Sequence, residues 1–266
     1  MVPKSVYTYM VVALAVASGV LSAACLAEDE TTRKFPLQGF ERVVLEGASS
    51  LEITQGDNFE VVATGPAEAI QYAHAEVRGD TLELGVTSKR KRFFGVLTVI
   101  DDHKVEFKVT LPQISAILVS GPGEARADTI ESKELELRVT GSGDLEVDKL
   151  AAESLLAAIT GSGDLTLGTV LAVSGETAIT GSGDLRLDSY AGESLAARIK
   201  GSGDMLINGR VSKLAVSVMG SGDFIGRNLL SDKATGSVMG SGDIVLRNPG
   251  QQSFSVMGSG DVALVD

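Results

Sequence analysis

The stretch Ile159-Thr-Gly-Ser-Gly-Asp-Leu-Thr-Leu167 contains the four-residue motif that decides the fold. Gly-Ser-Gly-Asp occurs seven times, and successive copies are 20, 20, 20, 19, 20 and 18 residues apart. A degenerate copy, Gly121-Pro-Gly-Glu124, lies one period upstream. Self-similarity at a fixed period of this length is typical of repeat architectures. The glycines of the seven copies are Gly141, Gly143, Gly161, Gly163, Gly181, Gly183, Gly201, Gly203, Gly220, Gly222, Gly240, Gly242, Gly258 and Gly260.

The residues on both sides of each motif alternate between apolar and polar side chains. Alternation with a period of two predicts β-strands that have one buried face and one solvated face. Thr140, Glu146, Thr166 and Arg186 fall on the solvated face. Each period is therefore interpreted as a strand, a glycine turn, a second strand and a variable loop. The positions expected to be buried are Leu135, Leu137, Val139, Leu145, Val147, Leu155, Ala157, Ile159, Leu165, Leu167, Leu185, Leu187, Leu195, Ala197, Ile199, Met205, Ile207, Leu214, Val216, Val218, Ile244, Leu246, Val262 and Leu264.

One such unit cannot bury its apolar face alone, so we expect each unit to stack on its neighbours. Stacking at the inter-strand spacing of about 4.8 Å gives a parallel β-solenoid with one repeat in each coil. A β-propeller is disfavoured because each blade needs four strands and about 40 residues. The predicted fold is all-β, a single domain with a solenoid over residues 121–266 and a less regular β cap over residues 36–120. Within the cap we expect a hairpin-like pair of strands over residues 40–56 and a short helix within residues 66–75.

The composition of the turn fits close stacking of one coil on the next. Glycine permits a positive φ and lets neighbouring backbones approach where a Cβ atom would collide. Serine and aspartate side chains accept hydrogen bonds from nearby backbone N–H groups in such turns. Replacement of Gly143 or Gly183 by valine is therefore expected to destabilise the coil.

The first 27 residues have the features of a secretory signal peptide. Lys4 precedes an apolar run that extends from Tyr9 to Leu21, and small residues follow it. This run is shorter than the roughly 20 residues of a membrane-spanning helix. Cleavage after Ala27 and lipoprotein processing with lipid attached at Cys25 are both open, and residues 28–35 are interpreted as a short polar linker. The expected location is outside the cytoplasm, in the periplasm, at the outer membrane or on the cell surface.

The seven aspartates of the motif are expected to stack into one column. A Ca²⁺ column is the functional interpretation, and capping of backbone N–H groups is the structural one. Carboxylates about 4.8 Å apart repel by only about 0.9 kcal/mol in water, so the column does not require a cation. We expect no cofactor and leave Ca²⁺ as the alternative. The column consists of Asp144, Asp164, Asp184, Asp204, Asp223, Asp243 and Asp261.

The charge and the few histidines and cysteines of the chain disfavour catalysis and nucleic-acid binding. The net charge of −12 disfavours nucleic acid as a partner, and two histidines and one cysteine do not furnish a His/Cys metal centre or a disulfide framework. His103 lies among carboxylates but is interpreted as a surface histidine, so the chain is not expected to be an enzyme. One basic cluster, expected at a hairpin tip, is interpreted as a solvated loop or a contact for an anionic partner. It comprises Lys89, Arg90, Lys91 and Arg92.

Three segments together resemble the putative auto-transporter adhesin, head GIN domain family. They are residues 47–57 (Gly-Ala-Ser-Ser-Leu-Glu-Ile-Thr-Gln-Gly-Asp), residues 109–114 (Val-Thr-Leu-Pro-Gln-Ile) and the Gly-Ser-Gly-Asp series. The resemblance covers roughly residues 36 to 266 and implies an exported bacterial β-solenoid without catalytic residues.

The predicted function is an exported, non-catalytic adhesin-like or interaction module of the bacterial cell envelope, with a glycan or protein as its ligand. The alternatives are a structural envelope solenoid, a Ca²⁺-binding solenoid and a β-helix enzyme that degrades polysaccharides. The last coil, residues 262–265, has no evident polar cap, so self-association is also expected.

Overall fold

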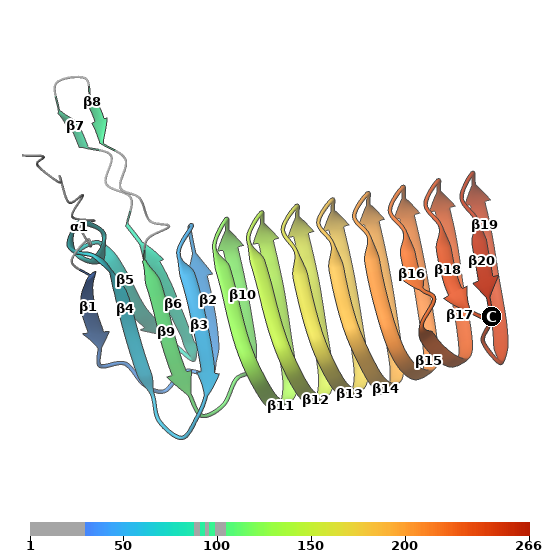
Figure 1. Ribbon diagram of the computed structural model, residues 1–266, viewed down its shortest axis with the longest axis horizontal. Helices are drawn as coiled ribbons and strands as arrows, with labels where there is room; N and C mark the ends of the chain where they lie inside the picture. The colour runs from blue at the N-terminus through green and yellow to red at the C-terminus, as the bar shows by residue number, and fades with distance from the viewer. Residues whose placement is uncertain (1–29, 88–90, 94–95, 99–104) are drawn as a thin grey trace, which may run out of the picture.

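The computed structural model describes residues 30–87, 91–93, 96–98 and 105–266. The expected signal peptide, with Cys25, lies outside these residues. The described chain forms an elongated rod of stacked coils, with an irregular cap at its N-terminal end (Figure 1). Within the described part, no helix has the length and apolar character needed to cross a bilayer.

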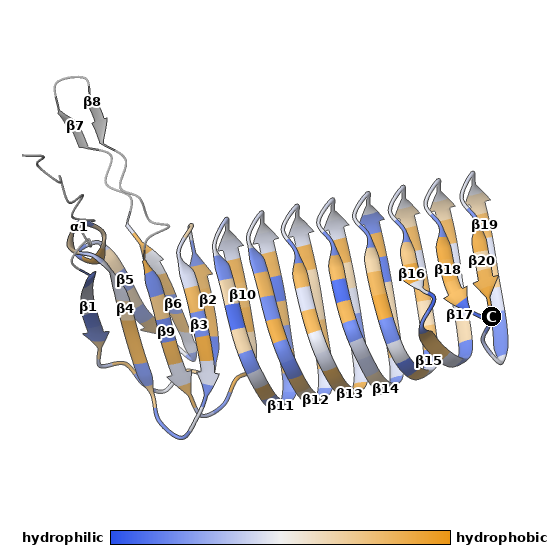
Figure 2. Cartoon of the chain, viewed as in Figure 1, coloured by the Kyte–Doolittle hydropathy of each residue, from blue (hydrophilic) through white to orange (hydrophobic). Residues whose placement is uncertain are grey.

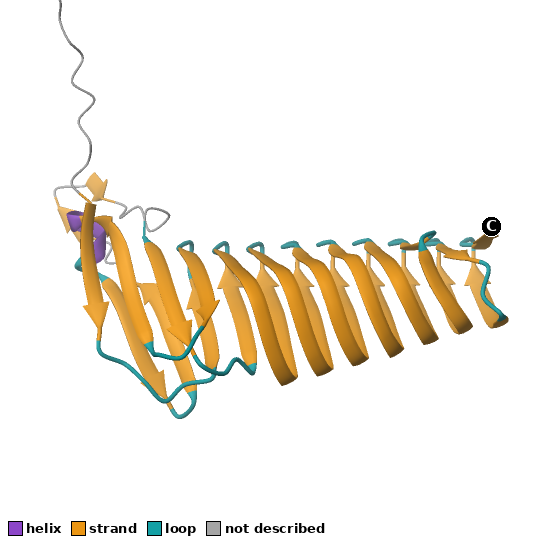
Figure 3. Ribbon diagram, turned by 60° about the horizontal axis from the view of Figure 1, so that its bottom comes forward, coloured by secondary structure: helices purple, strands orange, loops and turns teal. Residues whose placement is uncertain are grey.

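The repeat folds into parallel coils, as the period predicts. In the central coils each strand runs from one glycine turn to the next and pairs in register with the strand of the following coil, so that Gly141 lies beside Gly161 and Gly161 beside Gly181. Figure 3 shows the coils following one another along the rod. The strands are β11 (Glu124–Gly141), β12 (Asp144–Gly161), β13 (Leu165–Gly181), β14 (Leu185–Gly201), β15 (Met205–Gly220), β16 (Phe224–Gly226), β17 (Leu229–Gly240), β18 (Ile244–Arg247), β19 (Gln251–Gly258) and β20 (Val262–Val265).

The core occupies the interior of the coils and contains the positions that alternation predicts. Hydrophobic and hydrophilic residues alternate along each coil (Figure 2). All the predicted inward residues from Leu135 to Leu246 are buried. Val262 and Leu264 are only half-buried, because β20 pairs with β18 on one side and the structure places no further coil on the other.

The variable loop expected between the two strands of each period is not a loop in the central coils. The backbone continues as a bent strand whose residues pair with the next coil, as Leu150 does with Val170. This segment also supplies a further inward position, occupied by Ile130, Leu150, Val170 and Tyr190. The ladder continues through the bend because backbone groups that leave it would need other hydrogen-bond partners.

Tyr190 shows how the coils accommodate differences in side-chain volume. Gly175 occupies the inward position that Leu155 and Leu195 hold in the adjacent coils, and a Cβ atom there would lie 2.8 Å from the Tyr190 hydroxyl. The ring of Tyr190 thus occupies the space that Gly175 leaves. The hydroxyl donates a hydrogen bond to the carbonyl oxygen of Ser194 at 2.9 Å.

Residues 40–56 do not form the expected hairpin. β2 (Arg42–Glu46) and β3 (Ser50–Gln55) pair in parallel with other strands, β2 with β6 and β10 and β3 with β9 and β11. They are the two limbs of a further coil, whose turn begins at Gly47, and the stacking therefore extends upstream of residue 121. The other strands of this part are β6 (Thr81–Val86), β9 (Glu106–Leu111) and β10 (Ala116–Gly121).

Antiparallel strands cover the N-terminal end of the rod. β5 (Ala73–Arg78) pairs with β6, β4 (Glu60–Pro66) pairs with β9, and β1 (Glu30–Phe35) pairs with β4. The expected polar linker over residues 28–35 is thus a strand from Glu30 onward. The expected helix is the four-residue α1 (Ala67–Ile70), because β5 has already begun at Ala73.

Candidate functional site

The glycine turns form a ridge along the rod in which backbone meets backbone. The carbonyl oxygen of Gly161 accepts hydrogen bonds from the N–H groups of Ser182 at 2.8 Å and Gly183 at 3.2 Å. A Cβ atom on Gly183 would lie 2.0 Å from the carbonyl oxygen of Gly163. Gly181 has a φ of +134°, which L side chains rarely adopt. The first glycine of the motif therefore provides the backbone conformation, and the second allows the close approach.

The aspartates form the expected column, and each carboxylate contacts the next coil. Asp144 accepts a hydrogen bond from the backbone N–H of Asp164 at 3.1 Å, and Asp164 accepts one from that of Asp184 at 2.9 Å. The same contact measures 2.8 Å at each later step up to Asp261. Asp261 accepts instead from the N–H of Val262. Hydrogen bonds to a charged acceptor are stronger than those between neutral groups, so the aspartate column stabilises the stacking of one coil on the next.

Cation binding by this column remains a hypothesis. One oxygen of each carboxylate from Asp144 to Asp243 already accepts a backbone N–H of the next coil. Among the described residues, no three His, Cys, Asp or Glu side chains are grouped so as to hold a metal ion.

Ion pairs on the outer faces link residues of different coils, and in one case two residues of the same strand. Arg42 of β2 donates to Glu136 of β11 at 2.9 Å, and Arg138 donates to the other carboxylate oxygen at 2.7 Å. These two guanidinium groups, Arg138 first, hold the pKa of Glu136 below its usual value. Arg126 pairs with Glu146 of the following coil. Such pairs stabilise the register without defining a catalytic site.

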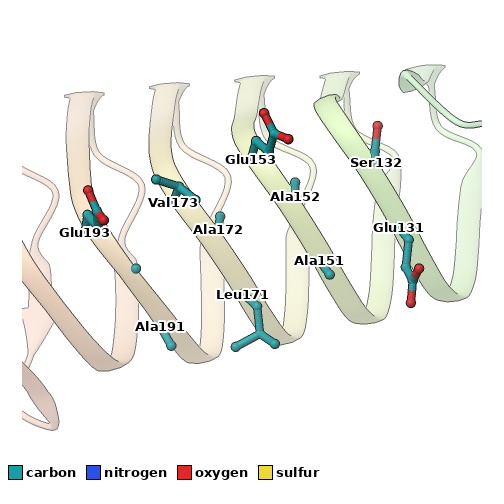
Figure 4. A pocket seen from close by; sticks show the side chains of 11 residues that line it. Glu131, Ser132, Ala151, Ala152, Glu153, Leu171, Ala172, Val173, Ala191 and Glu193 are labelled. Carbon is teal, nitrogen blue, oxygen red and sulfur yellow. The ribbon is translucent and has the colours of Figure 1, made fainter.

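A shallow groove of about 540 Å³ lies where the strands bend, and alternation did not predict it. Five small residues line it: Ala151, Ala152, Ala172, Ala191 and Gly192. Leu171 and Val173 are 55% and 52% exposed. Figure 4 shows both among the labelled alanines, with Glu131, Glu153 and Glu193 from different coils around them. The surface is thus aliphatic and bordered by carboxylates.

A second hollow of about 750 Å³ joins this groove at Glu131 and Ser132, which line both. It lies at the junction of the cap with the repeat and is lined also by Gln55, Pro112 and Lys133. The Gln55 side chain donates to the carbonyl oxygen of Glu131 at 2.9 Å and so joins the cap to the repeat. Together the two hollows extend along several coils.

The remaining candidate residues lie outside or at the edge of the described part. Lys91 and Arg92 belong to β7 (Lys91–Phe93), which pairs with β8 (Val96–Thr98) in an antiparallel hairpin, whereas Lys89 and Arg90 lie outside the described residues. Cys25 and His103 also lie outside them. The interpretations of these residues therefore stay predictions.

The fold defines the chain as a repeat protein of the parallel β-solenoid class. Two matches, over residues 39–174 and 168–265, then place it in a family: the chain belongs to the family described as putative auto-transporter adhesin, head GIN domain. The resemblance noted in the sequence is thereby confirmed. A comparison with curated protein sequences finds no match.

Several solved structures share the fold. A putative adhesin from Parabacteroides merdae superposes with a TM-score of 0.78 at 18% identity, covering 89% of this chain and 96% of that one. A putative adhesin from Parabacteroides distasonis gives 0.76 at 19% identity, with 90% and 98% covered. A putative lipid binding protein from P. distasonis gives 0.66 at 20% identity, with 89% and 97% covered. At these identities the likeness establishes the fold alone.

Proposed function

We propose that the chain is an exported, non-catalytic adhesion module of the bacterial envelope that binds an extended polypeptide in the groove around Leu171 and Val173. The family description and the names of the structural neighbours support an adhesive role. The observation that carries the proposal is the pair of exposed aliphatic side chains among small residues, bordered by Glu131, Glu153 and Glu193.

The chemistry of the groove favours a polypeptide with apolar and basic side chains. Exposed aliphatic residues that adjoin one another mark interaction sites more often than single ones do. Leu171 and Val173 lie on one strand, and Ala151 and Ala191 beside Leu171 extend the aliphatic surface to the two adjacent coils. Among the residues that the structure describes, none of those lining the groove is aromatic, so contacts in the groove are made with aliphatic and carboxylate side chains. Carboxylates at the border steer and align a cationic partner. The even spacing of the coils suits a ligand that lies along the rod.

The location of the protein is tested first. Surface proteolysis of intact cells, combined with cell fractionation, distinguishes a chain displayed on the surface from one enclosed in the periplasm. The proposal expects cleavage on intact cells. Protection from protease on intact cells, with cleavage after the outer membrane is opened, would support the structural envelope role instead.

The groove itself is tested by exchanging its two exposed aliphatic residues. We expect Leu171→Ser with Val173→Ser to lower binding to whole cells and to arrays of basic-apolar peptides by at least tenfold. The matched control is Leu230→Ser, because Leu230 is 43% exposed and lies in the same bend, in β17, beyond the residues that line the groove. Equal binding by the groove variant, or binding to a glycan array alone, would contradict the proposal.

A further inference from the structure

Three methionines form an exposed column on the outer face of the last coils. Met219 pairs in register with Met239, and Met239 pairs in register with Met257. Their exposed fractions are 44%, 52% and 70%. Each precedes the first glycine of a Gly-Ser-Gly-Asp turn, so the three thioethers project from equivalent positions on adjacent strands.

The column departs from what the same position holds upstream. There the residues are Thr140, Thr160, Thr180 and Lys200, each in register with the next. A solvated position normally takes such polar side chains, whereas methionine is usually buried. Met205 shows the ordinary case, since it is fully buried and accepts a hydrogen bond from the Thr177 hydroxyl at 3.2 Å. The exposed methionines of the described residues thus all lie in this one column.

The spacing of the column fits a metal ion held between two sulfur atoms. Neighbouring strands lie about 4.8 Å apart, which is close to twice a metal–sulfur distance of about 2.3 Å. The methionine side chain has three rotatable bonds, so the thioethers adjust to an ion between them. Thioether sulfur is a neutral, soft ligand that selects Cu⁺ over hard cations such as Ca²⁺ and Mg²⁺, which take oxygen ligands.

The surrounding charges decide where along the column a cation is most stable. Lys200 is the register neighbour of Met219, and its ammonium group disfavours a cation there. Met239 and Met257 lie one and two coils farther from this ammonium group than Met219 does. An aspartate follows each of the three methionines four residues later (Asp223, Asp243 and Asp261), so it is the distance from Lys200 that favours a cation at Met239 and Met257. The net charge of −12 also attracts cations to the molecule.

We propose that Met239 and Met257, with Met219 as a third ligand, form a binding site for a soft monovalent metal ion, Cu⁺ or Ag⁺. The site involves no change of oxidation state and no covalent chemistry on the protein. It is independent of the groove and of the adhesive role, because it uses other residues on other coils.

The test titrates Ag⁺ into the full chain carrying Cys25→Ser, so that the thiol does not contribute, in chloride-free buffer. The ε-methyl resonances of the methionines are followed by NMR. We expect those of Met239 and Met257 to shift most, that of Met219 to shift less, and that of Met205 to stay unchanged. Ca²⁺ at the same concentration should leave all four unchanged.

Substitution by leucine removes the sulfur and keeps the apolar volume. We expect Met239→Leu with Met257→Leu to weaken Cu⁺ binding at least tenfold, measured anaerobically against a chromogenic Cu⁺ chelator. Met205→Leu is the control and should keep the affinity. The melting temperature of each variant verifies that the fold is retained. Undiminished Cu⁺ binding by the double variant, or Ag⁺ shifts as large at Met205 as at Met239, would overturn the proposal.

Discussion

Replacement of Gly183 by alanine tests the backbone contacts of the turns. The added Cβ atom would lie 2.0 Å from the carbonyl oxygen of Gly163, a fixed backbone atom that cannot rotate away. Real Cβ atoms essentially never come within 3.0 Å of such an atom, so the two coils must separate at this turn by at least about 1 Å. The Gly183→Val variant adds further bulk at the same place.

The size of the effect follows from the hydrogen bonds that this separation breaks. The turn joins its neighbour through Ser182 N–H and Gly183 N–H to the Gly161 carbonyl oxygen, and through Asp184 N–H to the Asp164 carboxylate. Neutral hydrogen bonds contribute about 0.5–1.5 kcal/mol each and one to a charged group about 1.5–3 kcal/mol. We therefore expect Gly183→Ala to lower the free energy of unfolding by about 2.5–6 kcal/mol.

Equilibrium urea unfolding followed by circular dichroism measures this change, with two controls. Ser182→Ala alters the same turn at an exposed side chain and should change stability by less than about 0.5 kcal/mol. Gly79→Ala should cost about 1–2 kcal/mol, because Gly79 has a φ of +68° but no atom within 4 Å of an added Cβ.

Hydrogen exchange shows where the loss of stability occurs, since coils of a repeat protein need not unfold together. Protection in Gly183→Ala should fall most over β13 and β14 and least over β2 and β3. Wild-type stability and exchange in this variant would refute the reasoning, because the coils would then not stack through their glycine turns at the described distance.

Four further results are expected. Asp184→Ala should lose about 1–3 kcal/mol of stability, whereas Asp184→Asn, which keeps an acceptor for the Asp204 N–H, should lose less. A melting temperature of the wild-type chain that rises with Ca²⁺ and falls with chelator would instead support the cation column. Burial raises the pKa of Tyr190 to about 12 from 10.0. The buried neutral hydroxyl therefore contributes fully to stability below pH 10, and this contribution is lost as the pH rises towards 12. Unfolding measured as a function of pH should show this loss in the wild type and not in Tyr190→Phe. Arg138 and Arg42 lower the pKa of Glu136 from 4.5. The ionised carboxylate therefore contributes to the free energy of unfolding above pH 4.5, and this contribution is lost as the pH falls through the lower folded-state value. Glu136→Gln should weaken the pH dependence of acid unfolding in that range, and a profile identical to that of the wild type would contradict the ion pairs. The open edge formed by β19 and β20 should make the sedimentation coefficient rise with concentration, whereas a strictly monomeric profile at high concentration would speak against pairing at that edge.

The repeat was predictable because two signals agree in it. The glycine motif sets the period, and alternation then assigns each side chain to a face, which is why Leu137 and Ile159 were placed in the core. The bends were not predictable in the same way, because alternation weakens there and a strand that bends resembles a loop in sequence. The large side chain of Tyr190 fills the volume left free by Gly175 in the adjacent coil, and the sequence of one period alone does not reveal this match.

The cap and the groove were less accessible from the sequence. Strands β2 and β3 are adjacent in the chain, which predicts a hairpin, but each pairs with strands later in the sequence, including β10 and β11 about 70 residues on. The groove depends on which outward residues of four different coils happen to be small or aliphatic. The aliphatic surface becomes apparent only from the register, which places Leu171 beside Ala151 and Ala191.

The most direct test of the stacked coils is a set of distances between spin labels on the serines of the turns. With Cys25 replaced by Ser, labels are placed in pairs at Ser142 and at Ser221, Ser241 or Ser259, which are four, five and six coils away. At about 4.8 Å for each coil, double electron–electron resonance should give separations near ~19, ~24 and ~29 Å. A linear increase of about 5 Å for each coil is the predicted result. Separations that do not increase from one pair to the next would contradict the parallel solenoid and the groove and methionine column built on it.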